Sequence, residues 1–89
     1  MSTVNTPVRS FRVTRPSRIV QALVWSHVDE DRGERHYTVS LRRMHLSTDG
    51  RWQEGAELTR EDLPAARKLL QRANGYLASL EYLRARHFC

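Results

Sequence analysis

The segment RHYTVSLRRMHL, residues 35–46, decides the fold of this chain. Its odd positions from 37 to 41 hold apolar or aromatic side chains, whereas its even positions from 36 to 42 hold polar or charged ones. Side chains two residues apart point to the same face of an extended strand. The alternation therefore predicts a β-strand in a sheet with one packed face and one solvent-exposed face that is basic and rich in hydrogen-bonding groups.

Further strands are expected on both sides of this segment. Residues 18–28 are apolar on both faces, which is typical of a central strand. The charged turn that follows contains Gly33, which favours the closure of a hairpin. Asp49 and Gly50 mark the next hairpin, and residues 51–58 are expected to form the strand after it. These consecutive strands and turns predict an antiparallel β-meander.

The first sixteen residues are expected to be a flexible basic arm. Residues 1–16 are rich in Ser, Thr and Asn and contain three arginines, which suits either a segment that wraps around nucleic acid or a solvated terminus. Residues 11–14 alternate between apolar and polar, so this part of the arm also fits a fourth strand at the edge of the sheet. The folded domain is expected at residues 17–86, followed by a short tail at residues 87–89.

One long helix is expected after the strands. Thr59 and Asp62 have the spacing of a capping box, and Pro64 suits the first turn of a helix for which Asp62 is the N-cap. Apolar residues then recur at alternating spacings of three and four, which is typical of an amphipathic helix of roughly twenty residues or more. The predicted fold class is therefore α+β, an antiparallel β-meander of three to four strands followed by one long C-terminal helix packed on the sheet.

The helix is also expected to bind a partner. Twenty helical residues span about 30 Å, which is more than a sheet of three or four strands needs as cover. Self-association would bury the remaining apolar surface and enlarge the small core of an 89-residue chain. The alternative is a helix that packs entirely on its own sheet. The residues expected at the surface of a homodimer are Leu70, Ala73, Tyr76, Leu77, Leu80 and Leu83.

Length and composition predict a single soluble domain. Chains divide into separate cores only at several times this length. Cys89 is the only cysteine, which suits a reducing cytoplasm. The first ten residues do not resemble a secretory segment, and the longest apolar-rich run, residues 19–28, is too short to cross a bilayer. The formal net charge of +5 favours polyanionic partners. We therefore expect a cytoplasmic protein without a membrane role.

No motif predicts an enzyme or a metal site. The sequence has no Gly-rich phosphate loop, no GxSxG or HExxH motif and no zinc-type cysteine pairing. His27 and His36 flank the same turn and are expected to approach each other. His36 and His45, however, are separated by an odd number of residues, so they face opposite sides of a regular sheet. We expect no catalytic residue, no metal ion, no cofactor and no small-molecule substrate.

Nucleic acid is the partner that the sequence favours most. Proteins that bind single strands combine cations that follow the phosphates with flat rings on which bases stack. Trp52 lies beside a turn and is the better stacking residue, whereas Trp25 and Tyr37 fit either a core or a displayed position. The residues expected to bind single-stranded DNA or RNA are Arg35, Arg42, Arg43, Arg51 and Trp52.

Residues 18–77 resemble a group of small bacterial proteins. Their shared pattern is a strand ending in Trp, a strand entry of the type G-x-x-Y/H, an alternating V-x-L-x-R strand, D-G-x-W and an acid-Leu helix start. In this chain these features are Trp25, residues 33–37, residues 39–43, residues 49–52 and Asp62-Leu63. The resemblance implies a fold more than an activity.

The order of strands followed by one helix is also similar to that of the transcriptional coactivator positive cofactor four family. Members of that family are homodimers that pair through their helices and hold single-stranded DNA on curved sheets. The residues to which the resemblance transfers this role, on the strands and the turn facing away from the helix, are Arg35, Arg42, Arg51 and Trp52. The alternative is a small protein-interaction module that acts through its helix and has no nucleic-acid role.

Overall fold

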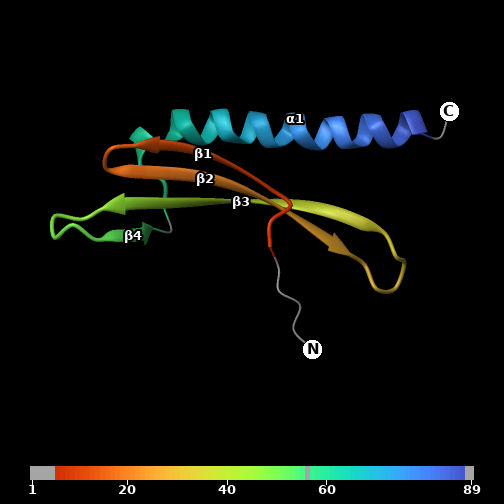
Figure 1. The fold of residues 1–89 in the computed structure, drawn as a ribbon, viewed down its shortest axis with the longest axis horizontal. Helices are drawn as coiled ribbons and strands as arrows, with labels where there is room; N and C mark the ends of the chain where they lie inside the picture. Colours follow the sequence, from red (N-terminus) through yellow and green to blue (C-terminus); the bar gives the residue numbers. More distant parts are fainter. Residues whose placement is uncertain (1–5, 56, 88–89) are drawn as a thin grey trace.

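The fold is a four-stranded antiparallel sheet covered on one face by a single long helix (Figure 1). The structure, a computed structural model, describes residues 6–55 and 57–87. Its elements in chain order are β1 (Arg9–Arg15), β2 (Arg18–Val28), β3 (Arg35–Leu46), β4 (Trp52–Gly55), the 3₁₀ turn η1 (Arg60–Asp62) and α1 (Leu63–His87). The strands lie in the order β1-β2-β3-β4. The predicted α+β class is confirmed.

The four-stranded alternative is the one observed. β1 belongs to the region predicted as an arm and pairs along its whole length with β2, from Arg9 opposite Val24 to Arg15 opposite Arg18. It therefore forms the edge of the sheet. The ends of the predicted arm and tail, at residues 1–5 and 88–89, lie outside the described residues.

Two glycines close the hairpins on either side of β3. Gly33 has a φ of 69° and Gly50 a φ of 84°, in the left-handed region where a side chain would be strained. The N–H of Gly33 donates to the carbonyl of Asp29 at 2.6 Å, and the N–H of Gly50 donates to the carbonyl of Ser47 at 3.0 Å. Both hairpins lie where the sequence predicts them.

The core lies between α1 and the central strand β2. Val20 and Ala22 of β2 pack against Ala66 and Leu69 of α1. The half-buried apolar residues that complete this core are Phe11, Val13, Val39, Leu41, Leu58 and Ala65. Val39 and Leu41 lie opposite Val24 and Ala22 in the register of β2 and β3, so the odd positions of β3 face the helix, as their alternation predicts.

A buried carboxylate joins the start of the helix to the sheet. Asp62 has no exposed surface, and its Oδ2 accepts hydrogen bonds from the backbone N–H and the hydroxyl of Thr59, each at 2.8 Å. Nη1 of Arg18 lies 3.3 Å from its Oδ1, and Nε of Arg43 lies 2.6 Å from its Oδ2. Burial by itself would raise the pKa of Asp62, but the hydrogen bonds from Thr59 and the charges of the two arginines together hold this pKa below its ordinary value. The predicted capping pair therefore also anchors β2 and β3.

Gly55 leaves room for this anchor. It ends β4 directly opposite Arg43, and a Cβ at this position would lie only 2.7 Å from Nη1 of Arg43. Because Asp62 holds the guanidinium group in place, a side chain at residue 55 would compete with the ion pair.

The helix is longer than the core that it covers. Its 25 residues extend over about 37 Å, yet among residues 63–83 the buried side chains, those of Ala66, Leu69 and Ala73, belong to its first half. Figure 1 shows the β2–β3 hairpin curving away from the C-terminal half of α1. Within the described ranges, no helix combines the length and the apolar character needed to span a bilayer.

Candidate nucleic-acid interface

We call the sheet face opposite α1 the open face. The helix packs against the face of the sheet that carries Val20 and Ala22 of β2 and their cross-strand partners on β3. The residues between these positions on each strand point to the opposite face. In the part of the chain that the structure describes, no element covers this face (Figure 1). The side chains that it carries include Arg12, Gln21, Leu23, Trp25, His27, His36, Thr38, Ser40, Arg42, Met44, Trp52 and Glu54.

Trp25 lies along the open face and not in the core. Its indole N–H donates to the hydroxyl of Ser40 at 2.8 Å. Ser40 is the cross-strand partner of Leu23, so the ring extends toward Leu23. Leu23 itself is only 6% exposed, although in the described residues no helix covers this face. The hydrogen bond fixes the indole, which remains half-exposed as a flat platform.

His27 and His36 extend this platform toward the β2–β3 hairpin. They are direct cross-strand partners, and their rings stack with centroids 5.2 Å apart and planes 22° apart. Nε2 of His27 lies 2.9 Å from Oγ1 of Thr38. The predicted approach of the two histidines is confirmed. Because His27 follows Trp25 by two residues on one strand, the three rings share one face.

Trp52 is displayed near the other end of the open face. It lies opposite Leu46 at the start of β4, and 42% of its surface is exposed. The preceding turn is held by the Asp49 carboxylate, which accepts hydrogen bonds from the hydroxyl of Ser47 and from the N–H of Arg51. These bonds lower the pKa of Asp49. The turn therefore holds Trp52 in an exposed position at the start of β4.

Arg42 and Arg12 supply positive charge between the two groups of rings. Nη2 of Arg42 lies 2.5 Å from Oε1 of Glu54, and both side chains are about half-exposed. An ion pair in solvent contributes at most about 1 kcal/mol, so Arg42 can exchange this partner for another anion. Arg12 and Arg42 both pair with Gln21, from the strands on its two sides.

Two of the arginines expected at this interface lie on the opposite face. Arg43 is bound by Asp62, and its side chain is only 17% exposed. Arg35 donates to the hydroxyl of Ser26 at 2.5 Å and lines a cleft beside the C-terminal half of α1. The expectation that Arg35 faces away from the helix is wrong. Arg35 is an odd-numbered residue of β3, and the odd-numbered residues Val39 and Leu41 of this strand point toward the helix. Arg51 is exposed in the turn next to Trp52.

Several contributors to the open face were absent from the predicted set. Arg12 and Gln21 belong to it because β1 pairs with β2 and places them side by side. The alternation of residues 11–14 in the sequence does not specify the register of this pairing. Ser40 and Thr38 hold the rings of Trp25 and His27. Thr38 and Ser40 are two of the polar even-numbered residues in segment 36–42, and this alternation was the signal that could have placed them on the open face.

The helix is rotated relative to the predicted dimer surface. Ala66, Leu69 and Ala73 face the sheet, and Ala73 is only 1% exposed, so its expected place at a partner surface is wrong. Tyr76 packs edge-on against Phe11, with ring centroids 6.4 Å apart. Of the other residues expected at the dimer surface, Leu70 and Leu83 are exposed, and Leu77 and Leu80 are half-buried.

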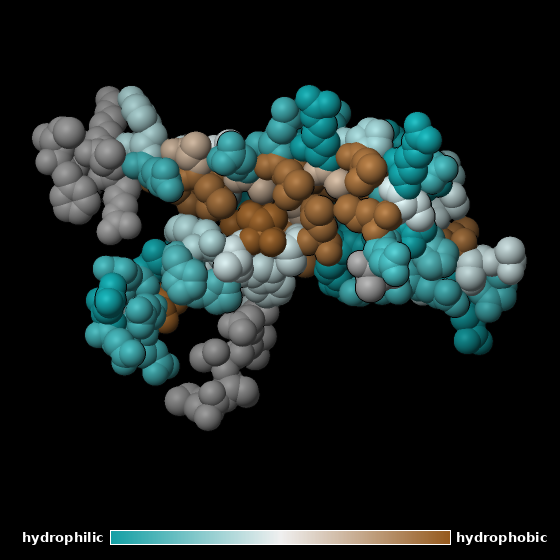
Figure 2. Space-filling view, turned by 180° about the vertical axis from the view of Figure 1, so that it is seen from behind, coloured by the Kyte–Doolittle hydropathy of each residue, from teal (hydrophilic) through white to brown (hydrophobic). Residues whose placement is uncertain are grey.

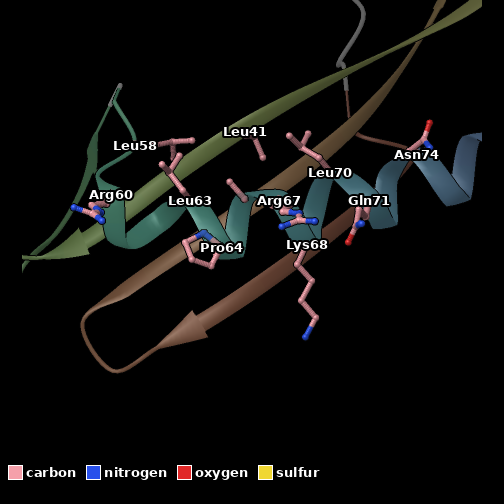
Figure 3. A pocket seen from close by; sticks show the side chains of 11 residues that line it. Leu41, Leu58, Arg60, Leu63, Pro64, Arg67, Lys68, Leu70, Gln71 and Asn74 are labelled. Atoms are coloured by element: carbon pink, nitrogen blue, oxygen red, sulfur yellow. The ribbon is translucent and has the colours of Figure 1, made fainter.

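With Ala66, Leu69 and Ala73 turned toward β2, an apolar groove remains along the side of α1 that carries Leu63 and Leu70. Leu63 and Leu70 of α1 face Leu41 of β3 and Leu58 across a groove of about 1160 Å³. Figure 2 shows this apolar band between the helix and the sheet, and Figure 3 shows the four leucine side chains gathered on one side of α1 while Lys68 points away. The polar residues at this groove are Arg60, Arg67, Lys68, Gln71 and Asn74.

The open face therefore combines fixed flat rings, hydroxyl and amide groups and exposed guanidinium groups. In the described ranges, three or more His, Cys, Asp or Glu side chains do not come together in a group able to hold a metal ion. No family model matches this chain, and no curated protein and no solved structure is significantly similar to it.

Proposed function

We propose that this protein binds single-stranded nucleic acid, with single-stranded DNA favoured, on the open face of its sheet. The observation that carries the proposal is the uncovered face itself, which displays Trp52 at one end and the rings of Trp25, His27 and His36 toward the other. From Thr38 to Leu46, β3 spans about 27 Å between these ring groups. Rings at intervals along such a face suit the bases of a single strand, which are free to stack on them. The paired bases of a duplex are already stacked on each other and are not free to do so.

The phosphates would be bound by arginines beside the rings. Arg42 lies between the ring groups and gives up only a solvent-exposed ion pair with Glu54 when it turns to a phosphate. Arg51, next to Trp52, is exposed and available to a phosphate of the stacked nucleotide. This arrangement predicts affinity that depends on salt but little on base sequence, because neither stacking nor phosphate contacts distinguish bases strongly.

Titration of a labelled oligothymidylate, followed by fluorescence anisotropy, tests this function. Loss of one stacked base costs about 1 to 3 kcal/mol, so we expect Trp52→Ala to weaken binding by about 5- to 150-fold. Tyr82→Ala removes a ring on α1 that is even more exposed than Trp52 and should leave the affinity unchanged. Absence of binding by the wild type at low salt, or tighter binding of duplex, would overturn the proposal.

The proposal extends to a homodimer formed through α1, as in the positive cofactor four family that the strand order resembles. Six residues recur along one side of the helix at spacings of three and four: Leu63, Arg67, Leu70, Asn74, Leu77 and Glu81. Leu63 and Leu70 are about half-exposed in the monomer. Burial of this row and of the adjoining groove would enlarge a core that is small for a free domain.

This row of residues is complementary to itself. Arg67 and Glu81 each lie seven residues from Asn74. In an antiparallel helix pair centred on Asn74, Arg67 of one copy therefore lies opposite Glu81 of the second copy, and the leucines interdigitate between them. A parallel pair would place like charges opposite each other, so the antiparallel arrangement is favoured.

Sedimentation equilibrium of charge-swapped variants tests the dimer. Arg67→Glu alone places two carboxylates at each contact, and Glu81→Arg alone places two cations there, so each should weaken association. The double variant restores opposite charges and should recover the dimer. A wild-type chain that stays monomeric at high concentration, or a double variant that associates no better than the single ones, would refute the pairing.

The apolar groove also favours the second candidate, a protein-interaction module. A groove lined by Leu41, Leu58, Leu63 and Leu70 fits an amphipathic helix of another protein. A protein that is monomeric and binds no oligonucleotide would support this alternative.

A further inference from the structure

A second basic surface lies where the edge strand β1 meets α1. A groove of about 390 Å³ is lined by Arg12 and Arg15 of β1 and by Lys68 and Arg72 of α1. Its other lining residues are Val13, Thr14, Pro64 and Ala65, so no carboxylate lines it. Lys68 and Arg72 are one turn apart on the helix. Cations thus stand on both walls of the groove.

These charges are not neutralised within the described part of the chain. The ion pairs formed there involve Arg18, Arg42 and Arg43, and none involves the four cations of the groove. The neighbouring depression contains Glu61 and Asp62, of which Asp62 is already bound by two arginines. Four like charges around a narrow groove raise the free energy of the unliganded protein, and a polyanion would relieve this repulsion.

Arg12 connects the groove with the open face. It belongs to the open face through its pairing with Gln21, and it also lines the groove. β1 is the edge strand of the sheet, so in the described ranges only its own side chains separate the two surfaces. Building on the proposed function, we infer that the strand whose bases stack on the open face turns around β1 and places its next phosphates between Arg15, Lys68 and Arg72.

The shape of the groove favours a nucleic-acid strand over other polyanions. A flat anionic bilayer would meet only the rims of a groove that lies between a strand and a helix. Guanidinium groups bind two phosphate oxygens at once, and three of the four cations are arginines. An acidic peptide carries similar charge but has no bases for the ring platform that adjoins the groove.

Two charge-matched variants test the inference by fluorescence anisotropy over a range of salt concentrations. Lys68→Gln/Arg72→Gln removes two cations from the groove, and Arg32→Gln/Arg35→Gln removes two exposed arginines at the β2–β3 hairpin, which do not line this groove. Oligothymidylates of about 4 and about 12 nucleotides serve as short and long probes. Each phosphate contact contributes about 0.7 to the slope of log K against log salt. The groove variant should therefore flatten the slope by about 1.4 for the long probe and leave the short probe unchanged.

The outcomes separate this inference from the proposed function. If the groove variant keeps the wild-type slope while Trp52→Ala weakens binding, the groove inference is wrong and the open-face function stands. If the groove variant loses the long probe while Trp52→Ala has no effect, the groove binds the strand and the open face does not. Poly-glutamate that displaces the long probe as well as unlabelled oligothymidylate does would assign the groove to acidic peptides. A wild type that binds neither probe refutes both.

Discussion

The two faces of the sheet use arginine in different ways. On the face covered by α1, two arginines have structural roles: Arg43 binds the buried Asp62 at 2.6 Å, and the guanidinium group of Arg9 lies 5.8 Å from the ring centroid of Tyr76. On the open face, Arg42 has only a solvent-exposed partner, Glu54. The net charge of a basic domain therefore overestimates the charge that is free for a ligand. Adjacent residues of one strand, such as Arg42 and Arg43, can have unrelated roles.

The largest expected difference between the faces is in stability. Asp62→Ala would leave Arg18 and Arg43 without their buried partner and would also remove the acceptor for Thr59. Breaking a buried ion pair costs about 3 to 5 kcal/mol, whereas loss of an exposed one costs less than about 1 kcal/mol. We therefore expect Glu54→Ala, the matched change on the open face, to have a small effect. Urea unfolding of both variants measures the difference, and equal losses would show that the two pairs are equivalent.

A second comparison concerns the two sides of the helix. Leu69 is completely buried against β2, whereas its neighbour Leu70 is 45% exposed at the apolar groove. Truncation of a buried leucine costs about 3 kcal/mol, so Leu69→Ala should destabilise the monomer by about that amount and Leu70→Ala by less than about 1 kcal/mol. Unfolding at a concentration at which the chain is monomeric distinguishes them. A larger loss for Leu70→Ala would mean that the helix is rotated from its position in the structure.

The same pair of leucines shows how far the sequence determines the helix. Alternating spacings of three and four establish that residues 63–83 form one amphipathic helix, and the capping pair Thr59–Asp62 fixes its start. The stripe is so wide, however, that rows through Leu69 and through Leu70 fit the pattern equally well. The choice between them depends on the contact with Val20 and Ala22, which is a tertiary interaction that local periodicity does not encode.

The candidate site was predictable to a similar extent. The parity of residues 36–42 specified one polar face, and the position of Trp52 beside a turn indicated its exposure. Asp62 was recognised as a capping residue, but its second role depends on Arg18 and Arg43, which are 44 and 19 residues away along the chain. The sequence therefore suggested more arginines for the ligand than the fold leaves available.

The pH dependence of stability sharpens the comparison between the faces. The pKa of Asp62 is lowered in the folded protein, so the folded state binds fewer protons than the unfolded state near the ordinary aspartate value of about 3.9. The stabilisation by Asp62 should be complete above that value and be lost as the pH falls through the lower, folded value. Thermal unfolding of the wild type and of Asp62→Asn should differ most at neutral pH and converge in acid.

Asp49 provides the control for this prediction. Its pKa is also lowered, by hydrogen bonds from Ser47 and Arg51, but it lies on an exposed turn. Asp49→Asn should therefore change the midpoint in the same direction and by less. If Asp62→Asn followed the same shallow profile, the buried carboxylate would not be ionised in the fold.

The smallest expected effect tests whether Arg42 is free to leave its partner. Glu54→Gln keeps the shape of the side chain and removes the carboxylate that competes with a phosphate for Arg42. An exposed ion pair contributes at most about 1 kcal/mol, so oligothymidylate binding should strengthen by no more than about fivefold. Glu57→Gln removes the same charge from an exposed position after β4 and controls for the change in net charge. If the two variants gained equally, only the overall charge would matter. If Glu54→Gln weakened binding, Glu54 would be orienting Arg42 toward the ligand and not competing for it.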